Sequence, residues 1–184
     1  LTHQAISAAL ELREQQQLTE ATIARVLVRT TTRGADILSD PSKYKPTTKE
    51  TADHSLPYCI AAALVDGHVL PSSFSEEKLA DPRIWSMLGK IKVVADAEID
   101  RLFPGTKRAI VEITDTAGRT HTAQVDHAKG SPENPMSDAE VVAKFTANAE
   151  AVMGAEQRER LIEATWALGT RPLAIRDYMQ LVVV

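Results

Sequence analysis

The chain has 184 residues, a formal net charge of −4 and 43% hydrophobic residues. That length allows one domain of ordinary size with a helical extension, and the composition excludes an intrinsically disordered chain. Because the balance is acidic and no long basic run occurs, a nucleic-acid interface based on phosphate neutralisation is also excluded, and small metabolites or proteins are the expected partners.

The single cysteine, Cys59, lies in an apolar run and cannot form an internal disulfide, which indicates a reducing compartment. No segment has the apolar length of a membrane span and no secretory leader is recognisable, so a cytoplasmic location is expected. The chain begins at Leu1 without a methionine and enters a helical pattern at once, which predicts a piece of a longer protein.

The first predicted elements are a helix and a strand. Apolar residues recur at helical spacing over 4–16, and β-branched residues dominate 21–31, which favours a strand. Residues 34–48 contain glycine and two prolines, so we expect mostly irregular structure with one helical turn over 35–38. The chain therefore starts as a helix, a strand and a long loop.

A helix buried on most sides is predicted to begin near Ser55. Serine caps a helix well, proline is tolerated in the first turn, and the residues that follow are apolar all round until Gly67. Two short helices are expected next, one starting at 75–78 and one starting at 81–85. The apolar helix is the expected centre of the core.

The rest of the predicted sheet follows. Residues 91–95 are strand-like, and 107–115 and 119–126 are two extended runs around a glycine-containing turn, which predicts a β-meander. After a loop over 130–135, Ser137 and Glu140 form a capping-box pattern at the start of a helix. Two further helices are expected over 155–168 and about 173–182.

These elements predict an α+β fold. We expect a two-layer sandwich with a mainly antiparallel sheet and helices on one face, plus C-terminal helices. A doubly wound parallel sheet fits less well, because the hairpin is antiparallel and no βαβα series occurs.

The histidines do not form a metal-ligating pattern. None of the five shares the helical spacing of a zinc motif with another histidine or with the cysteine, so no metal site is expected. Phosphate-binding glycine loops and nucleophile elbows are also absent from the sequence. The common motif-bearing enzyme classes therefore receive no support.

The most informative polar residues lie at the start of the apolar helix. His54, Ser55 and Tyr58 place an imidazole, a hydroxyl and a phenol at a helix end, where free backbone N–H groups favour an anion such as a carboxylate. The alternative is that Asp53 or Ser55 caps the helix and that the histidine is structural. The residues alone leave both interpretations open.

Two more residues are candidate substrate contacts. Arg33, at the exit of the first strand, can bind a carboxylate with its two-pronged guanidinium, although a surface role is its ordinary alternative. His3 lies in the first turn of the first helix. His121 and His127 lie in or after the hairpin, where a solvated side chain is the ordinary outcome.

The segment 49–67 closely resembles the ADHSLPY…AALxDG signature of the MmgE/PrpD family. Further resemblances follow in the same order along the chain, at Phe74-Ser75, Asp81-Pro82-Arg83, 130–137 and Lys144-Phe145. The similarity covers nearly the whole sequence.

The resemblance implies a fold and an activity. Members of this family, such as 2-methylcitrate dehydratase, cis-aconitate decarboxylase and iminodisuccinate epimerase, act on small polycarboxylates without a required metal or organic cofactor. They combine a large helical domain with a smaller α+β lid, and the active site lies between the two. For this sequence it implies a helix leading into the lid over 1–20, the lid domain over 21–135, and C-terminal helices over 136–184 that pack on a helical domain absent from the chain.

The resemblance implies a C-terminal portion of a 2-methylcitrate dehydratase-like hydro-lyase, in a protein that is a homodimer. His54 and Tyr58 are its expected catalytic residues, with Ser55, Arg33 and His3 as substrate contacts. Most catalytic groups are expected upstream, so the chain alone is expected to be inactive. The alternatives are a decarboxylase or epimerase of the same family, or a non-catalytic dimerisation or binding module. The apolar residues 181–184 at the end of the chain favour the module.

Overall fold

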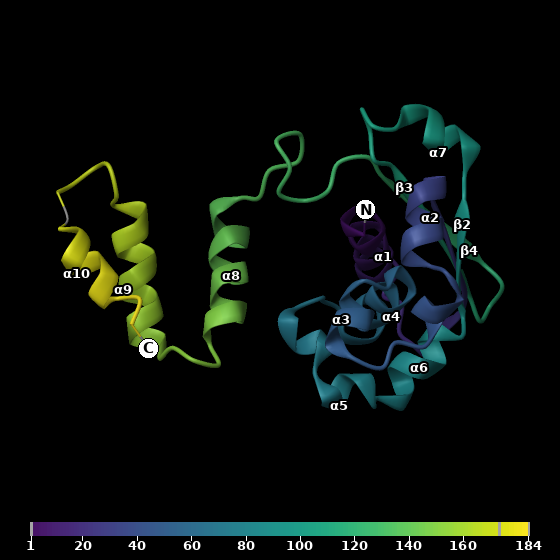
Figure 1. The fold of residues 1–184 in the computed structure, drawn as a ribbon, viewed down its shortest axis with the longest axis horizontal. Helices are drawn as coiled ribbons and strands as arrows, with labels where there is room; N and C mark the ends of the chain where they lie inside the picture. Colours follow the sequence, from purple (N-terminus) through teal and green to yellow (C-terminus); the bar gives the residue numbers. More distant parts are fainter. Residues whose placement is uncertain (1, 173, 184) are drawn as a thin grey trace. The chain divides into compact units, whose positions relative to one another are not determined.

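The computed structural model describes residues 2–172 and 174–183. The chain divides into two compact units, Leu1–Pro135 and Met136–Val184 (Figure 1). Each unit is described by itself.

The first unit contains a four-stranded sheet in the order β2-β1-β3-β4. The strands are β1 (Ile23–Thr30), β2 (Ile91–Ala95), β3 (Ala109–Asp115) and β4 (Thr120–Val125). β1 pairs in parallel with β2 and antiparallel with β3, and β3 pairs antiparallel with β4. The predicted α+β class with a mainly antiparallel sheet is confirmed, whereas the predicted meander is wrong, because β1 lies between β2 and β3.

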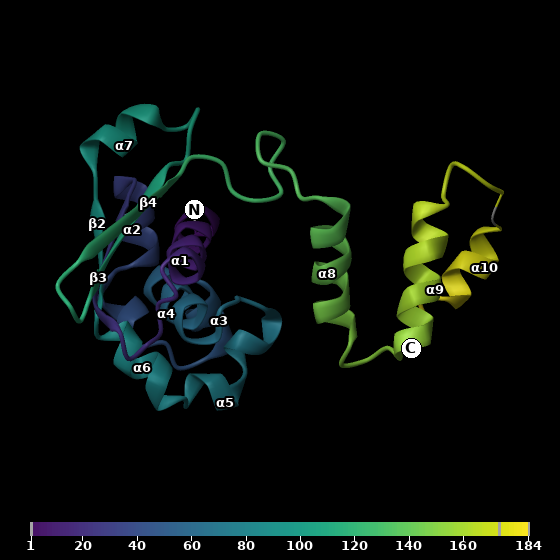
Figure 2. The same ribbon diagram turned by 180° about the vertical axis from the view of Figure 1, so that it is seen from behind.

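Helices cover one face of this sheet (Figures 1 and 2). Helix α1 (His3–Gln15) packs on β3 and β4, and α4 (Leu56–Asp66) packs on α1 and β2. Along β3 every second residue is buried. The buried strand residues Val26, Val28 and Val111 join the helices in one core.

Helix α4 is the centre of that core, as its composition predicts. Every residue from Leu56 to Val65 is buried. Ser55 caps its first turn, and Gly67 ends it with a φ of 79°, a left-handed conformation that glycine adopts without steric cost.

Seven short helices complete the first unit. They are α2 (Thr32–Leu38), η1 (Pro41–Tyr44), α3 (Lys49–Asp53), η2 (Pro71–Phe74), α5 (Glu76–Leu79), α6 (Pro82–Leu88) and α7 (Ala97–Leu102). The predicted helix starts at 75–78 and 81–85 are confirmed as α5 and α6. The helical turn expected over 35–38 is confirmed as part of α2, and η1 is a second short helix within the segment 34–48. No element was predicted over 49–53 or 97–102, where α3 and α7 are capped locally by the side chains of Thr48 and Asp96.

The second unit consists of α8 (Asp138–Ala149), α9 (Ala155–Trp166) and α10 (Ile175–Gln180). The capping box of Ser137 and Glu140 is present at the start of α8. Ala149, Met153 and Leu161 form a small buried cluster, with three partly buried neighbours. The predicted start of the last helix at 173, and Val184 of the apolar end, lie outside the described residues.

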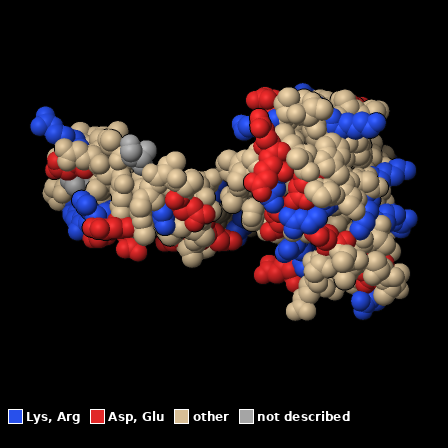
Figure 3. Space-filling view, turned by 90° about the horizontal axis from the view of Figure 1, so that it is seen from below, with Lys and Arg blue, Asp and Glu red and all other residues tan. Residues whose placement is uncertain are grey.

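Within residues 2–172 and 174–183, no helix is long and apolar enough to cross a membrane. The face shown in Figure 3 carries both basic and acidic side chains in scattered groups, with uncharged surface between them.

Candidate functional site

Ser55 occupies the start of α4 and is fully buried. Its Oγ accepts a hydrogen bond from the backbone N–H of Tyr58 at 3.1 Å and donates one to the carbonyl oxygen of Lys43 at 2.6 Å. The serine therefore caps the helix and ties it to η1. Of the two interpretations that the sequence left open for Ser55, the structure shows the helix cap.

Tyr58 is also fully buried. Its hydroxyl donates to the carbonyl oxygen of Ser73 at 2.9 Å, and its ring lies 5.9 Å from that of Phe74. Burial, with a further contribution from the charge of Asp66, raises the pKa of Tyr58 to about 12. In this arrangement the phenol holds η2 against α4, and contact with a substrate would require η2 to move.

His54 lies at the surface, with 72% of its side chain exposed. Its Nδ1 is 3.0 Å from the carbonyl oxygen of Glu50 and 2.5 Å from Oδ1 of Asp53. Such contacts orient the ring and leave Nε2 available to a ligand. A hollow of about 330 Å³ lies beside this segment, lined by Lys49, Asp53, Val69, Leu70, Pro71 and Phe74.

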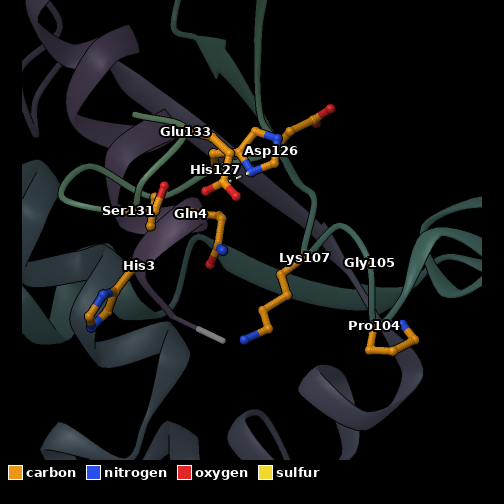
Figure 4. Close-up of a pocket in the computed structure, with 10 residues that line it drawn as sticks. His3, Gln4, Pro104, Gly105, Lys107, Asp126, His127, Ser131 and Glu133 are labelled. Carbon is orange, nitrogen blue, oxygen red and sulfur yellow. Dashed lines mark ion pairs between the residues drawn. The ribbon is translucent and has the colours of Figure 1, made fainter. Parts of the chain in front are cut away.

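A second and more polar hollow lies at the start of α1 (Figure 4). We call it the α1 cleft. It has a volume of about 390 Å³ and is lined by His3, Gln4, Pro104, Gly105, Lys107, Asp126, His127, Ala128, Ser131 and Glu133. The cleft contains His3, one of the predicted substrate contacts.

Three segments far apart in the sequence build the α1 cleft. His3 opens α1, Lys107 lies just before β3, and His127 lies just after β4. The first pair of the β3–β4 hairpin joins Ala109 to Val125, so Lys107 and His127 each lie two residues beyond it. Lys107 and His127 therefore lie at the open end of the hairpin, in the cleft at the start of α1.

Of the two acidic residues that line the α1 cleft, Asp126 is bound to an arginine and Glu133 lies near a histidine. Arg108 binds Asp126 through two hydrogen bonds of 2.7 Å, and this guanidinium holds the pKa of Asp126 below its ordinary value. Oε2 of Glu133 lies 3.7 Å from Nδ1 of His127. The pKa of Glu133 is lowered as well, chiefly by a hydrogen bond from its own backbone N–H.

The α1 cleft joins two imidazoles with an ammonium group. Imidazole moves protons near neutral pH, and ammonium binds carboxylates. Among residues 2–172 and 174–183, no group of three or more histidine, cysteine or acidic side chains is placed to hold a metal ion.

The structure does not bring all the predicted site residues together. His3 lines the α1 cleft, whereas Arg33, on α2, lines neither hollow. His54 is exposed next to the second hollow, and Ser55 and Tyr58 are inside the core. Their predicted roles in catalysis and substrate binding stay predictions.

The sequence analysis did not single out Lys107 and gave His127 only as a solvated side chain, and the structure places both in the lining of the α1 cleft. The signal for both was the hairpin register: a turn at 115–118 places 107 and 127 opposite each other, beyond the last paired residues. Nothing in the sequence places His3 beside them, because helix and hairpin meet only through tertiary packing.

The first unit is thus an α+β domain with a polar cleft at the start of α1. Residues 1–168 match the model of the MmgE/PrpD C-terminal domain, and the chain belongs to this family.

Two relatives have the same name. The chain is 29% identical over 117 residues to cis-aconitate decarboxylase of Mus musculus and 30% identical over 120 residues to cis-aconitate decarboxylase of Homo sapiens. Each match covers 64% of this chain and 24% of the relative. The chain thus spans about a quarter of the length of the curated relatives it matches.

Proposed function

We propose that this chain is the carboxy-terminal part of a lyase that removes water from a small tricarboxylate of the 2-methylcitrate type. The observation that carries the proposal is the family match over residues 1–168. The polar α1 cleft supports it, because it offers a proton-transferring group and a cation to an anionic substrate.

The reaction defines what the protein must supply. A base removes a proton from the carbon beside a carboxylate, the electron pair forms the double bond, and the hydroxyl on the neighbouring carbon leaves as water after protonation. Cationic groups stabilise the negative charge that develops on the carboxylate. His3 is the residue of this chain that we propose to exchange a proton with the substrate, and the remaining groups come from the part of the enzyme that precedes it.

His54 is proposed as a second contact, at the edge of the substrate site. Its ring is oriented by Glu50 and Asp53 and is open to a ligand. Arg33 is exposed, and is proposed to hold a distal carboxylate.

A second candidate reaction is decarboxylation. Both curated relatives are named cis-aconitate decarboxylase, and that substrate is also a tricarboxylate. The α1 cleft would have the same task in both reactions, which is to stabilise the negative charge that develops next to a carboxylate.

The second unit is proposed to pack against an amino-terminal helical part of the same polypeptide. Its apolar hollow of about 370 Å³ is lined by Val141, Val142, Phe145, Leu161, Ile162, Thr165, Trp166, Tyr178 and Val182. Trp166 is 50% exposed, which is unusual for so large an apolar side chain. The relatives are long enough to supply the covering helices, because the chain accounts for 24% of their length.

The test is turnover by the intact enzyme, in which this chain is joined to its amino-terminal part. Formation of an unsaturated acid from 2-methylcitrate is followed by ultraviolet absorbance, and release of carbon dioxide from cis-aconitate is measured in parallel. Turnover of 2-methylcitrate supports dehydration, and turnover of cis-aconitate alone selects decarboxylation. If neither acid is converted, the lyase proposal fails and a binding module becomes the better account.

A further inference from the structure

We propose that Lys107 binds a carboxylate of the substrate in the α1 cleft. This inference rests on the proposed function, because it assigns the anchoring of a polycarboxylate to one residue of this chain. Lys107 belongs neither to the polar residues at the start of α4 nor to the family signature over 49–67, so the sequence analysis assigned it no role.

The position of Lys107 is the first observation. The residue lies in the segment between α7 and β3 and is exposed. Figure 4 shows its side chain extended along the cleft, with the amino group on the side of His3 and away from His127 and Glu133. A carboxylate bound there would lie between the ammonium group and the imidazole proposed to exchange the proton.

The second observation is that the ammonium group is uncompensated. In the part of the chain that the structure describes, Lys107 makes no ion pair or hydrogen bond, whereas the neighbouring Arg108 is bound to Asp126 by two hydrogen bonds. Asp126 is therefore neutralised by Arg108 and does not compete for the lysine. Among the described residues that line the cleft, Lys107 is the one lysine or arginine, and its ammonium group has no partner there.

Other lysines of the same unit show the contrast. Lys78 is bound to Asp66 at 2.7 Å, and Lys90 donates to the carbonyl oxygens of Glu20 and Ile23 at 3.0 and 2.7 Å. These two lysine side chains stabilise the fold. Lys107 makes no such bond among the described residues, so its charge is free to attract an anion into a cleft that also holds two histidines.

The experiment compares Lys107→Gln, Lys107→Arg and wild type in the intact enzyme, with Lys92→Gln as the matched control. Lys92 is an exposed lysine of β2 that does not line the α1 cleft. Binding of citrate is measured by calorimetry, and KM and kcat are measured for whichever tricarboxylate is converted.

Lys107→Gln is expected to weaken citrate binding about tenfold or more and to raise KM by a similar factor, because a hydrogen bond to a charged group is lost. Lys107→Arg is expected to restore most of the binding, and Lys92→Gln to leave it unchanged. Unchanged citrate binding in Lys107→Gln, or no citrate binding by the wild type, overturns the assignment.

The two proposals fail in different ways. If citrate binding depends on Lys107 but neither tricarboxylate is converted, the anion site stands and the lyase proposal fails. If a tricarboxylate is converted with the same KM by wild type and Lys107→Gln, the lyase proposal stands and the role of Lys107 is refuted.

Discussion

The hydroxyl of Tyr58 donates a hydrogen bond of 2.9 Å to the backbone carbonyl of Ser73. This bond joins the first turn of the central helix to η2 in a part of the core from which water is excluded. In this structure, Tyr58 of the family signature therefore has a structural role: it holds η2 against α4.

Replacing Tyr58 by phenylalanine tests that structural role. The change keeps the ring and leaves the Ser73 carbonyl without its donor, so the free energy of unfolding is expected to fall by about 1 kcal/mol in urea denaturation. Tyr178→Phe is the control, because its hydroxyl lies 3.0 Å from Thr165 in an exposed position and its loss is expected to change less. A Tyr58→Phe enzyme with unchanged stability and a strongly reduced kcat would instead support contact between the phenol and the substrate.

The cap of α4 gives a second prediction. Ser55→Ala removes the side-chain acceptor for the Tyr58 N–H and the donor to Lys43, and is expected to cost about 1 to 2 kcal/mol of unfolding free energy. Ser75→Ala, which removes the cap of the four-residue α5, is the matched control and is expected to cost less. If the two variants lost the same unfolding free energy, burial of the Ser55 cap would not add to its contribution.

Several elements were predictable from the sequence, among them α4, α5, α6 and the β3–β4 hairpin, whereas the short helices α3 and α7 were not predicted. The apolar run after Ser55 has no alternative to a buried helix, and the turn before Gly118 sets the hairpin. By contrast, α7 depends on Asp96, whose side chain accepts from the N–H groups of Glu98 and Ile99. Caps of the same kind were recognised in the sequence at Ser55 and Ser137, but the cap at Asp96 was found only in the structure.

The candidate site was predicted less well than the fold. A residue type at a helix start indicates possible chemistry, but it does not say whether the side chain faces solvent or the core. Ser55 and Tyr58 face the core and His54 faces solvent. His3 and Lys107 line the same cleft because α1 packs across β3 and β4. Tertiary packing decides these outcomes, and a single sequence does not encode it in a local pattern.

The hairpin turn gives a prediction on pH. Burial alone would raise the pKa of Asp115, but hydrogen bonds from the backbone N–H of Arg119 and from the side chains of His121 and Arg119 lower it to about 2. A carboxyl group whose pKa is lower in the folded state than its ordinary value of 3.8 stabilises the fold above that value. The contribution is lost as the pH falls through about 2.

Asp115→Asn is therefore expected to unfold at a lower temperature than wild type at neutral pH. The difference should shrink as the pH falls below about 4 and vanish only below about pH 2, where the carboxyl of the folded wild type is itself protonated. Thermal unfolding followed by circular dichroism over this range measures it. A difference that does not depend on pH would show that the charge of Asp115 is not what the turn requires.

Charge in the α1 cleft gives a further prediction. Glu133 is the lining carboxylate that is not bound to an arginine, and it repels an anionic substrate. Glu133→Gln is expected to lower KM about twofold to fivefold at low salt, with a smaller effect at high salt. Glu159→Gln, an exposed change in α9, is the control. A higher KM in Glu133→Gln would mean that the carboxylate assists binding through His127.

The measurement that tests the central claim most directly is kcat/KM of the intact enzyme with His3→Ala, beside His68→Ala as an exposed-histidine control. If the α1 cleft is one wall of the substrate site and His3 exchanges a proton there, kcat/KM falls by about 10² to 10⁴ in His3→Ala and stays at the wild-type value in His68→Ala. A His3→Ala enzyme that is folded and within about twofold of wild type contradicts the account.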